Sequence, residues 1–268
     1  MQWGSTLATY AYPVIGELPV ANVELPHVVK LLEPIWQTKT ETATRVRGRI
    51  EAVLAWATVS GFRTGDNPAR WRGNLDAVLP KPAKLKNVKH HAALSWREIG
   101  DFMPNLRDRE GTAARALEFL ILTAARSGEV RGATWSEIDL KRRIWVVPAS
   151  RMKAGRDHVV PLSDDLMALL EGLPKVEGND LLFPAPRGGM LSDMALSAVM
   201  KRMKVDATPH GFRSTFRDWA SETTSYPHEV CEMALAHTIN SAVERAYRRG
   251  DLLEKRKRLM TDWTTFIN

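Results

Sequence analysis

The sequence has few of the features that mark secreted, membrane-embedded or disulfide-bonded proteins. Its 268 residues include one cysteine, Cys231, which by itself can form neither an internal disulfide nor a thiolate metal cluster. No apolar run approaches the ~20 residues that span a bilayer. Met1 is followed by Gln2-Trp3-Gly4-Ser5, without the basic and apolar regions of a signal peptide. These absences predict an intracellular protein with no membrane partner.

Sequence motifs for bound nucleotides and metals are also missing. We find no Gly-rich phosphate loop and no zinc-ligand spacing, and the pair His90-His91 has no cysteine or carboxylate partner nearby. Carboxylates are scattered along the chain, which argues against a two-metal nuclease. We therefore expect no cofactor and no metal ion.

Acidic residues are absent from Ala77 to Arg97, while lysines recur there. The lysines of this stretch are Lys81, Lys84, Lys86 and Lys89. Residues 1–92 hold 12 Lys and Arg against 7 Asp and Glu, whereas residues 93–268 hold 26 against 24, so most of the net charge of +7 lies in the first third. A basic stripe suits a polyanion, because phosphate contacts supply much of nucleic-acid binding. The alternative is a solvated linker. Charge alone does not distinguish a nucleic-acid-binding stretch from such a linker.

Helical periodicity dominates the first 80 residues. A helix is predicted over residues 27–37, and a second begins near Thr38 and Glu41, which have the spacing of a capping box. The apolar positions of the second helix form one stripe: Val46, Ile50, Val53, Leu54 and Ala57. Arg45 and Arg49 lie one turn apart on a neighbouring face, where they can meet a DNA backbone or solvent.

Proline and glycine mark the irregular stretches of this half. Residues 3–20, which contain Pro13, Gly16 and Pro19, are predicted to be loop-like. The run Pro80-Lys81-Pro82 interrupts regular structure, and the polar, basic residues 81–91 are predicted to form a linker. Residues 1–80 are therefore predicted to be a small all-α domain.

The second domain is predicted to cover residues 92–268. Residues 113–125 are apolar on nearly all faces, which indicates a buried core helix. Residues 143–147 and 158–162 are rich in β-branched side chains and flank a polar turn, which predicts an antiparallel hairpin. Helical segments follow to the end of the chain. The predicted fold class is mainly α with a small antiparallel β-sheet.

Several residues of the second domain are suited to phosphate chemistry. Arg126 follows an apolar helix, and its planar fork matches two phosphate oxygens. Glu129, three residues later, can orient Arg126, and a purely structural ion pair between them is the alternative. Lys153 occupies the hairpin turn beside Arg151 and Arg156, and these cations can lower its pKa enough for it to act as a proton donor. The alternative for Lys153 is an ordinary surface lysine.

A helix is predicted to start at Pro209, with Thr208 as its N-cap. His210 then lies in the first turn, where unpaired amides favour an anion, and Arg213 lies three residues on along the same face. This pair can form a phosphate-binding site. The alternative is that both residues lie on a solvated helix face.

His237 and Tyr247 complete the set of candidate residues. His237 follows a predicted helix end, and Tyr247 is flanked by Arg248 and Arg249. A phenol has a pKa of about 10, so nucleophilic attack at neutral pH needs nearby cations or a base. The alternative for Tyr247 is a packing role. The other tyrosine of this domain, Tyr226, precedes a proline at a helix entrance and is assigned a structural role.

The order of these residues resembles the successive catalytic boxes of the tyrosine recombinases, the phage integrase family. The resemblance covers the whole chain, with residues 1–80 similar to the helical, SAM-like core-binding domain and residues 92–268 similar to the catalytic domain. It is closest to prophage and genomic-island integrases, and it begins at the core-binding domain, so we expect the N-terminal arm-binding domain to be lacking. The runs that carry it are Ala124-Ala125-Arg126-Ser127-Gly128-Glu129, Met152-Lys153, His210-Gly211-Phe212-Arg213, Leu235-Ala236-His237 and Ala246-Tyr247.

The resemblance implies a role for each candidate residue. Tyr247 would attack the scissile phosphate and form a 3′-phosphotyrosine link. Arg126 and Arg213 would clamp the non-bridging oxygens, and Lys153 would protonate the leaving 5′-oxygen. His210 would act as the acid/base group near the tyrosine. His237 would hydrogen-bond the phosphate, and Glu129 would support an arginine.

The resemblance also implies partners and a location. Four protomers would act on double-stranded attachment-site DNA, helped by DNA-bending accessory proteins, in the bacterial cytoplasm at the nucleoid. Arg45, Arg49 and the linker lysines would contact the DNA backbone. Two alternatives stay open at this point: a truncated, non-catalytic DNA-binding remnant, and a topoisomerase-like enzyme with the same chemistry.

Overall fold

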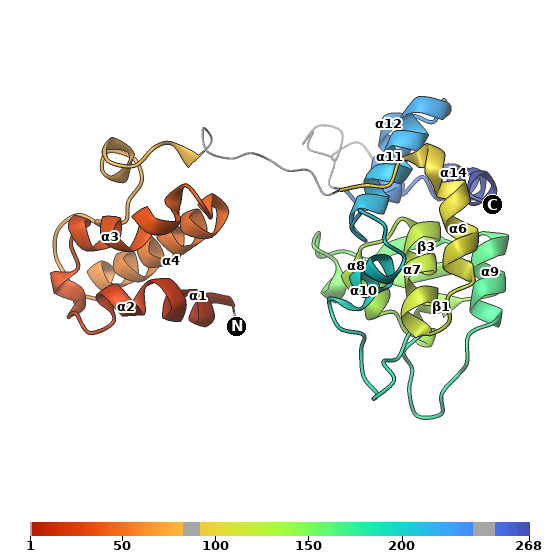
Figure 1. Cartoon of the computed structure of the whole chain (residues 1–268), viewed down its shortest axis with the longest axis horizontal. Coiled ribbons are helices and arrows are strands. Elements are labelled where there is room, and N and C mark those ends of the chain that lie inside the picture. The colour runs from red at the N-terminus through yellow and green to blue at the C-terminus, as the bar shows by residue number, and fades with distance from the viewer. Residues whose placement is uncertain (1, 83–91, 238–249) are drawn as a thin grey trace. The chain divides into compact units, whose positions relative to one another are not determined.

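The computed structural model describes residues 2–82, 92–237 and 250–268 (Figure 1). The chain divides into two compact units, Met1–Lys89 and His90–Asn268. Among the candidate catalytic and DNA-binding residues named above, Lys84, Lys86, Lys89 and Tyr247 lie outside the described ranges. Within the described ranges, no helix combines the length and the apolar character needed to traverse a bilayer.

The first unit is a small helical domain. It contains α1 (Gln2–Tyr10), α2 (Tyr12–Ile15), α3 (Leu25–Trp36) and α4 (Thr40–Val59), together with two short 3₁₀ turns, Val20–Asn22 and Leu75–Ala77. Helices α3 and α4 supply most of its core, which includes the buried side chains of Leu32, Val46 and Ile50. Trp36 stacks on Trp71 at 5.5 Å between ring centroids, and its indole N–H donates to the Pro80 carbonyl at 2.8 Å.

Two local predictions for the first unit are wrong. The opening stretch is helical, not loop-like, because Pro13 occupies the first turn of α2, where a missing N–H costs no hydrogen bond. The helix expected after Thr38 begins at Thr40 without a side-chain cap, and the Thr38 hydroxyl donates instead to the Pro34 carbonyl at 3.2 Å. The rest of the apolar stripe of α4 is buried, whereas Val53 lies beside it and is 43% exposed.

The second unit combines a set of helices with a three-stranded sheet. Strands β1 (Ile138–Asp139), β2 (Ile144–Val147) and β3 (His158–Pro161) are antiparallel in the order β1-β2-β3, and Trp145 pairs with Val160. This confirms the predicted hairpin; the sequence does not predict β1, because two residues are too few to make an alternating pattern. The helices are α6 (Ile99–Arg107), α7 (Thr112–Thr123), α8 (Ser127–Arg131), α9 (Asp164–Glu171), α10 (Ala195–Arg202), α11 (Gly211–Thr223), α12 (His228–Ala234) and α14 (Leu253–Phe266).

Helix α7 is the centre of this unit, as its apolar sequence predicts. It contacts α6, α8, α9, α10 and α14, and Figure 1 shows it surrounded by other elements. Phe119 packs edge-on against Trp145 of β2 at 5.2 Å, and the Trp263 indole of α14 donates to the Ile121 carbonyl at 2.9 Å. The loop that leaves the C-terminal end of α7 is thereby held at a fixed place, and it carries Arg126.

Candidate active site

Arg126 lies between α7 and α8 and is held from both sides. Ala124 has a left-handed backbone (φ 51°), which turns the chain sharply after α7. Glu129 accepts a hydrogen bond from the backbone N–H of Arg126 at 2.9 Å and one from its Nη1 at 2.7 Å. Nη2 of Arg126 donates to the Ala236 carbonyl at 3.2 Å. The Glu129 side chain is 5% exposed and that of Arg126 is 25% exposed, so the guanidinium is oriented by a buried carboxylate yet reaches the surface.

Arg213 projects from α11 into the interior and is only 4% exposed. Its Nη1 donates to the Ala124 carbonyl and its Nη2 to the Leu235 carbonyl, both at 2.6 Å. Burial, with the positive charge of Arg126 nearby, lowers the pKa of Arg213 to about 10, so it remains charged at neutral pH. The alternative of a solvated helix face is therefore wrong for Arg213.

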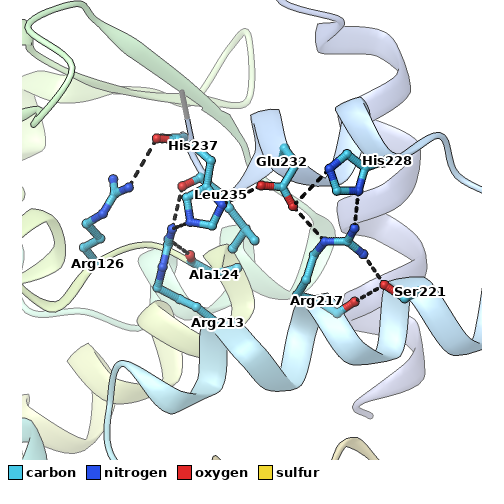
Figure 2. A network of polar contacts seen from close by, with 10 residues as sticks. Ala124, Arg126, Arg213, Arg217, Ser221, His228, Glu232, Leu235 and His237 are labelled. Carbon is cyan, nitrogen blue, oxygen red and sulfur yellow. Dashed lines mark hydrogen bonds and ion pairs between the residues drawn. The ribbon is translucent and has the colours of Figure 1, made fainter. Parts of the chain in front are cut away.

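His237 joins Arg213 to Glu232 of α12, and the carbonyl of the residue before it, Ala236, accepts from Arg126. Its Nε2 lies 3.0 Å from Nη2 of Arg213, and its Nδ1 lies 2.7 Å from Oε2 of Glu232 (Figure 2). Arg126, Arg213 and His237, which are distant in the sequence, are thus brought together. Glu232 was not predicted as a site residue, and its only sequence signal is its position five residues before His237.

His210 lies at the entrance of α11 and is exposed. The helix begins at Gly211 rather than at Pro209, and the Thr208 hydroxyl accepts a hydrogen bond from the Gly211 N–H at 3.0 Å. The exposed His210 side chain and the buried Arg213 side chain therefore meet different environments, in contrast to the shared solvated face considered above.

Lys153 lies in the turn between β2 and β3 and is exposed. Arg151 fixes the base of this turn, because its Nη1 donates to the Glu129 carbonyl at 2.6 Å and its Nη2 pairs with Glu137. Met152 and Ala154, the neighbours of Lys153, line a pocket of about 230 Å³ that His237 also lines. The hairpin turn and the histidine thus border the same pocket.

His158 of β3 lies in this pocket and was given no role from the sequence. Burial, aided by the positive charges of Arg256 and Arg126, lowers the pKa of His158 to about 4, while Glu129 and a hydrogen bond to the Ala234 backbone act in the opposite direction. His158 is therefore neutral in the folded protein at neutral pH.

The depressed pKa of His158 predicts a loss of stability in acid. The unfolded chain takes up a proton near pH 6.5 and the folded chain only near pH 4, so the free energy of unfolding should fall as the pH drops between these values. The full effect is on the order of 3 kcal/mol. Chemical unfolding of the wild type and His158→Gln from pH 8 to pH 4 measures it, and the variant should lack this component. His27→Gln, in the first unit, should retain it, and identical profiles for wild type and His158→Gln would contradict the assignment.

The residues predicted to contact DNA lie in the first unit or beyond the described ranges. Arg45 is exposed and pairs with Glu41 at 3.1 Å. Arg49 is partly buried, with its guanidinium 5.6 Å from the centre of the Trp3 ring and a contact to Thr6. Lys81 is exposed at the end of this unit. Their contact with DNA stays a prediction.

The chain matches known proteins along most of its length. The sequence model of the phage integrase central domain matches residues 1–74, and that of the phage integrase family matches residues 94–252. Prophage integrase IntA of Escherichia coli (strain K12) is 31% identical over 265 residues, which cover 96% of this chain and 62% of that protein. A lambda integrase dimer bound to a COC′ core site has the same fold, with a TM-score of 0.65 and 17% identity over 93% of this chain and 87% of that one. A lambda integrase tetramer bound to a Holliday junction also gives a TM-score of 0.65, with 16% identity over 90% of this chain and 71% of that one.

These findings define the class of protein. The chain belongs to the phage integrase family of tyrosine recombinases, and the predicted fold class, an all-α domain followed by a mainly α catalytic domain with a small antiparallel sheet, is confirmed. The chain spans about 62% of the length of IntA.

Proposed function

We propose that this chain is the DNA-cutting part of a site-specific recombinase that integrates or excises a mobile element. The observation that carries the proposal is the convergence of Arg126, Arg213 and His237 from three separate parts of the chain. Guanidinium groups that stay charged at neutral pH suit the non-bridging oxygens of a phosphodiester. Membership of the phage integrase family supports the same activity.

The reaction proceeds through a covalent link between protein and DNA. The phenol oxygen of Tyr247 forms a bond to the scissile phosphorus, and the bond from phosphorus to the 5′-oxygen breaks. Lys153 gives its proton to the leaving 5′-oxygen, and His210 acts as the acid/base group beside the phenol. Because the phosphotyrosine retains the energy of the phosphodiester, the 5′-hydroxyl of another strand reseals it without ATP.

The arginines act on the charge that develops during this step. Negative charge builds on the non-bridging oxygens of the pentavalent transition state, and fixed cations stabilise it without having to reorganise. Glu129 and the Ala236 carbonyl orient Arg126, while the Ala124 and Leu235 carbonyls orient Arg213. His237 helps to orient Arg213, because its Nε2 lies 3.0 Å from Nη2 of that arginine.

The other tyrosine of the catalytic unit is poorly suited to be the nucleophile. The Tyr226 hydroxyl donates to Asp262 at 2.6 Å. Burial, together with this hydrogen bond and the charge of Asp262, raises the pKa of Tyr226 to about 12, which disfavours the phenolate. Tyr247 precedes Asp251 by four residues, and Asp251 lines the pocket with His237.

Double-stranded DNA carrying an attachment site is the proposed substrate. The lambda integrase tetramer on a Holliday junction, which has this fold, supports an assembly of four protomers. We assign backbone contacts to Arg45, Arg49 and the lysines of the linker, namely Lys81, Lys84, Lys86 and Lys89, because phosphate contacts supply most of the affinity for DNA. DNA-bending proteins would assist the assembly, and the bacterial nucleoid is the proposed place of action.

Covalent capture tests the proposal. A nicked core-site duplex, with the sequence read from the junctions of the element that encodes the chain, should trap a protein–DNA adduct, because the short cleaved strand diffuses away. The adduct should form in EDTA, since guanidinium groups rather than a metal ion neutralise the phosphate. Peptide mapping should locate the link at Tyr247, so Tyr247→Phe should form no adduct and still bind the duplex, whereas Tyr226→Phe should react normally.

The other outcomes identify other functions. Normal binding without any adduct would mean that the chain is a non-catalytic remnant. Relaxation of plasmids that lack an attachment site would indicate a topoisomerase-like activity. A strict requirement for Mg²⁺ would contradict the proposed roles of Arg126 and Arg213.

A further inference from the structure

A carboxylate of α12, that of Glu232, lies between Arg217 of α11 and His237. Oε1 of Glu232 accepts a hydrogen bond from Nε of Arg217 at 2.8 Å, and Oε2 lies 2.7 Å from Nδ1 of His237. Arg217 also contacts Nδ1 of His228 and the Ser221 hydroxyl. Figure 2 shows the row that results: Arg213 and Arg217 extend from one face of α11 toward His237 and Glu232.

The chemistry of the neighbours determines which nitrogen of His237 carries hydrogen. Arginine can only donate hydrogen bonds, so Nε2 of His237, 3.0 Å from Nη2 of Arg213, must accept. Nδ1 therefore carries the hydrogen and donates it to Glu232. Burial acts to raise the pKa of Glu232, but hydrogen bonds from His237 and Arg217 outweigh it and hold the pKa below its usual value. Glu232 is thus ionised and can accept at both oxygens.

We propose that Glu232, held in place by Arg217, is a positioning residue that fixes His237 with its hydrogen on Nδ1 and thereby orients the guanidinium of Arg213. The importance of this role for catalysis rests on the proposed function. The hydrogen-bond pattern is independent of that function. A carboxylate that sets the tautomer of a catalytic imidazole is the logic of a hydrolytic triad, in which the carboxylate itself never touches the substrate. Here the imidazole in turn holds a phosphate-binding arginine.

The variant Glu232→Gln separates positioning from packing, because glutamine has nearly the same shape. Arg217 can only donate, so the glutamine oxygen faces Arg217 and its amide nitrogen faces His237. Nδ1 of His237 must then accept, and the hydrogen moves to Nε2, where it opposes a donor of Arg213. The variant should therefore fold normally and hold His237 in the wrong tautomer.

Long-range ¹H–¹⁵N correlation spectra of the chain with ¹⁵N-labelled histidine measure the tautomer directly, with His237→Ala used to assign the signal. In the wild type the hydrogen should be on Nδ1, and in Glu232→Gln this signature should be lost. Glu222→Gln is the matched control, because it removes a carboxylate from an exposed site on α11 that pairs with Arg97 instead. It should leave the spectrum of His237 unchanged.

Rates of adduct formation at saturating DNA provide the functional arm. Glu232→Gln should react about 10- to 100-fold more slowly than wild type, the usual effect of removing a group that orients an active residue. In the His237→Ala background the same change should have no further effect.

Each arm can overturn the proposal. Hydrogen on Nε2 in the wild type, or an unchanged tautomer in Glu232→Gln, would refute the assigned pattern. An equal loss of rate in the His237→Ala background would mean that Glu232 acts independently of His237. If the wild type forms no adduct at all, the proposed function fails, and the spectra still decide the role of Glu232.

Discussion

Replacement of Arg213 by lysine is expected to slow formation of the covalent adduct by about 10²- to 10³-fold, the usual effect of removing one preorganised donor from a transition state. The positive charge survives in this variant, but the planar fork does not. The guanidinium of Arg213 spans three acceptors, the carbonyls of Ala124 and Leu235 and Nε2 of His237. An ammonium group is a single point, so it cannot satisfy all three and still face a phosphate in a fixed direction.

Single-turnover rates on the nicked duplex at saturating DNA provide the measurement. Circular dichroism should show a folded protein, since lysine retains the aliphatic stem that lies buried at this position. Arg202→Lys, at an exposed arginine near the end of α10, is the matched control and should react at the wild-type rate. A rate for Arg213→Lys within a few-fold of wild type would mean that charge alone suffices and that the geometry of Arg213 is incidental.

Gly211→Ala is expected to destabilise the catalytic unit by on the order of 3 kcal/mol, through overpacking and lost hydrogen bonds. A Cβ at this position would lie 2.2 Å from the Ala92 carbonyl oxygen and 2.9 Å from Cα of Ala93. Both atoms belong to the backbone, so the entering chain must move away from α11. That movement breaks the hydrogen bonds from Thr208 N–H to Ala92 at 2.8 Å and from the Thr215 hydroxyl to Leu94 at 2.6 Å.

Thermal unfolding monitors this effect, and a loss of this size should lower the Tm by roughly 6–12 °C. Gly100→Ala is the matched control, because Gly100 lies in α6 and a Cβ added there would have no atom within 4 Å among the described residues. Alanine favours a helix over glycine, so this control should unfold at the wild-type temperature or slightly above it. If Gly211→Ala unfolds at the same temperature as the wild type, the chain before α6 adjusts to the added Cβ at no cost in stability.

The parts of the fold that the sequence predicts well are those whose signals are local. The buried helix α7 is apolar on nearly all faces, and the β2–β3 hairpin has β-branched runs on either side of a polar turn. The ion pair between Arg126 and Glu129 spans three residues and is readable from spacing. The sequence does not predict α1 and α2, because Pro13 has the pattern of a helix breaker, although a proline in the first turn is tolerated.

The environment of Arg213 could not be predicted in this way. Its partners at Ala124 and Leu235 are backbone carbonyls. Every residue has a backbone carbonyl, so the side-chain sequence does not indicate which ones will bind Arg213. The turns that present carbonyls to the arginines use alanine in the left-handed region, at Ala124 and Ala236, where a sequence reader looks for glycine. Glu232 was missed for a similar reason, since His237 lies beyond the end of α12 and helical spacing does not relate the two.

The hydrogen bonds that hold the two arginines join residues 89 positions apart, in Arg213 and Ala124, and 110 positions apart, in Arg126 and Ala236. A chain still growing on the ribosome lacks at least one of these partners until Ala236 has been added. Under the proposed activity, DNA cleavage therefore becomes possible only after Ala236 has been added and the catalytic unit has folded. Under the same proposal, a nascent chain or a proteolytic fragment that ends before Ala236 lacks the pair of oriented arginines that cleavage requires.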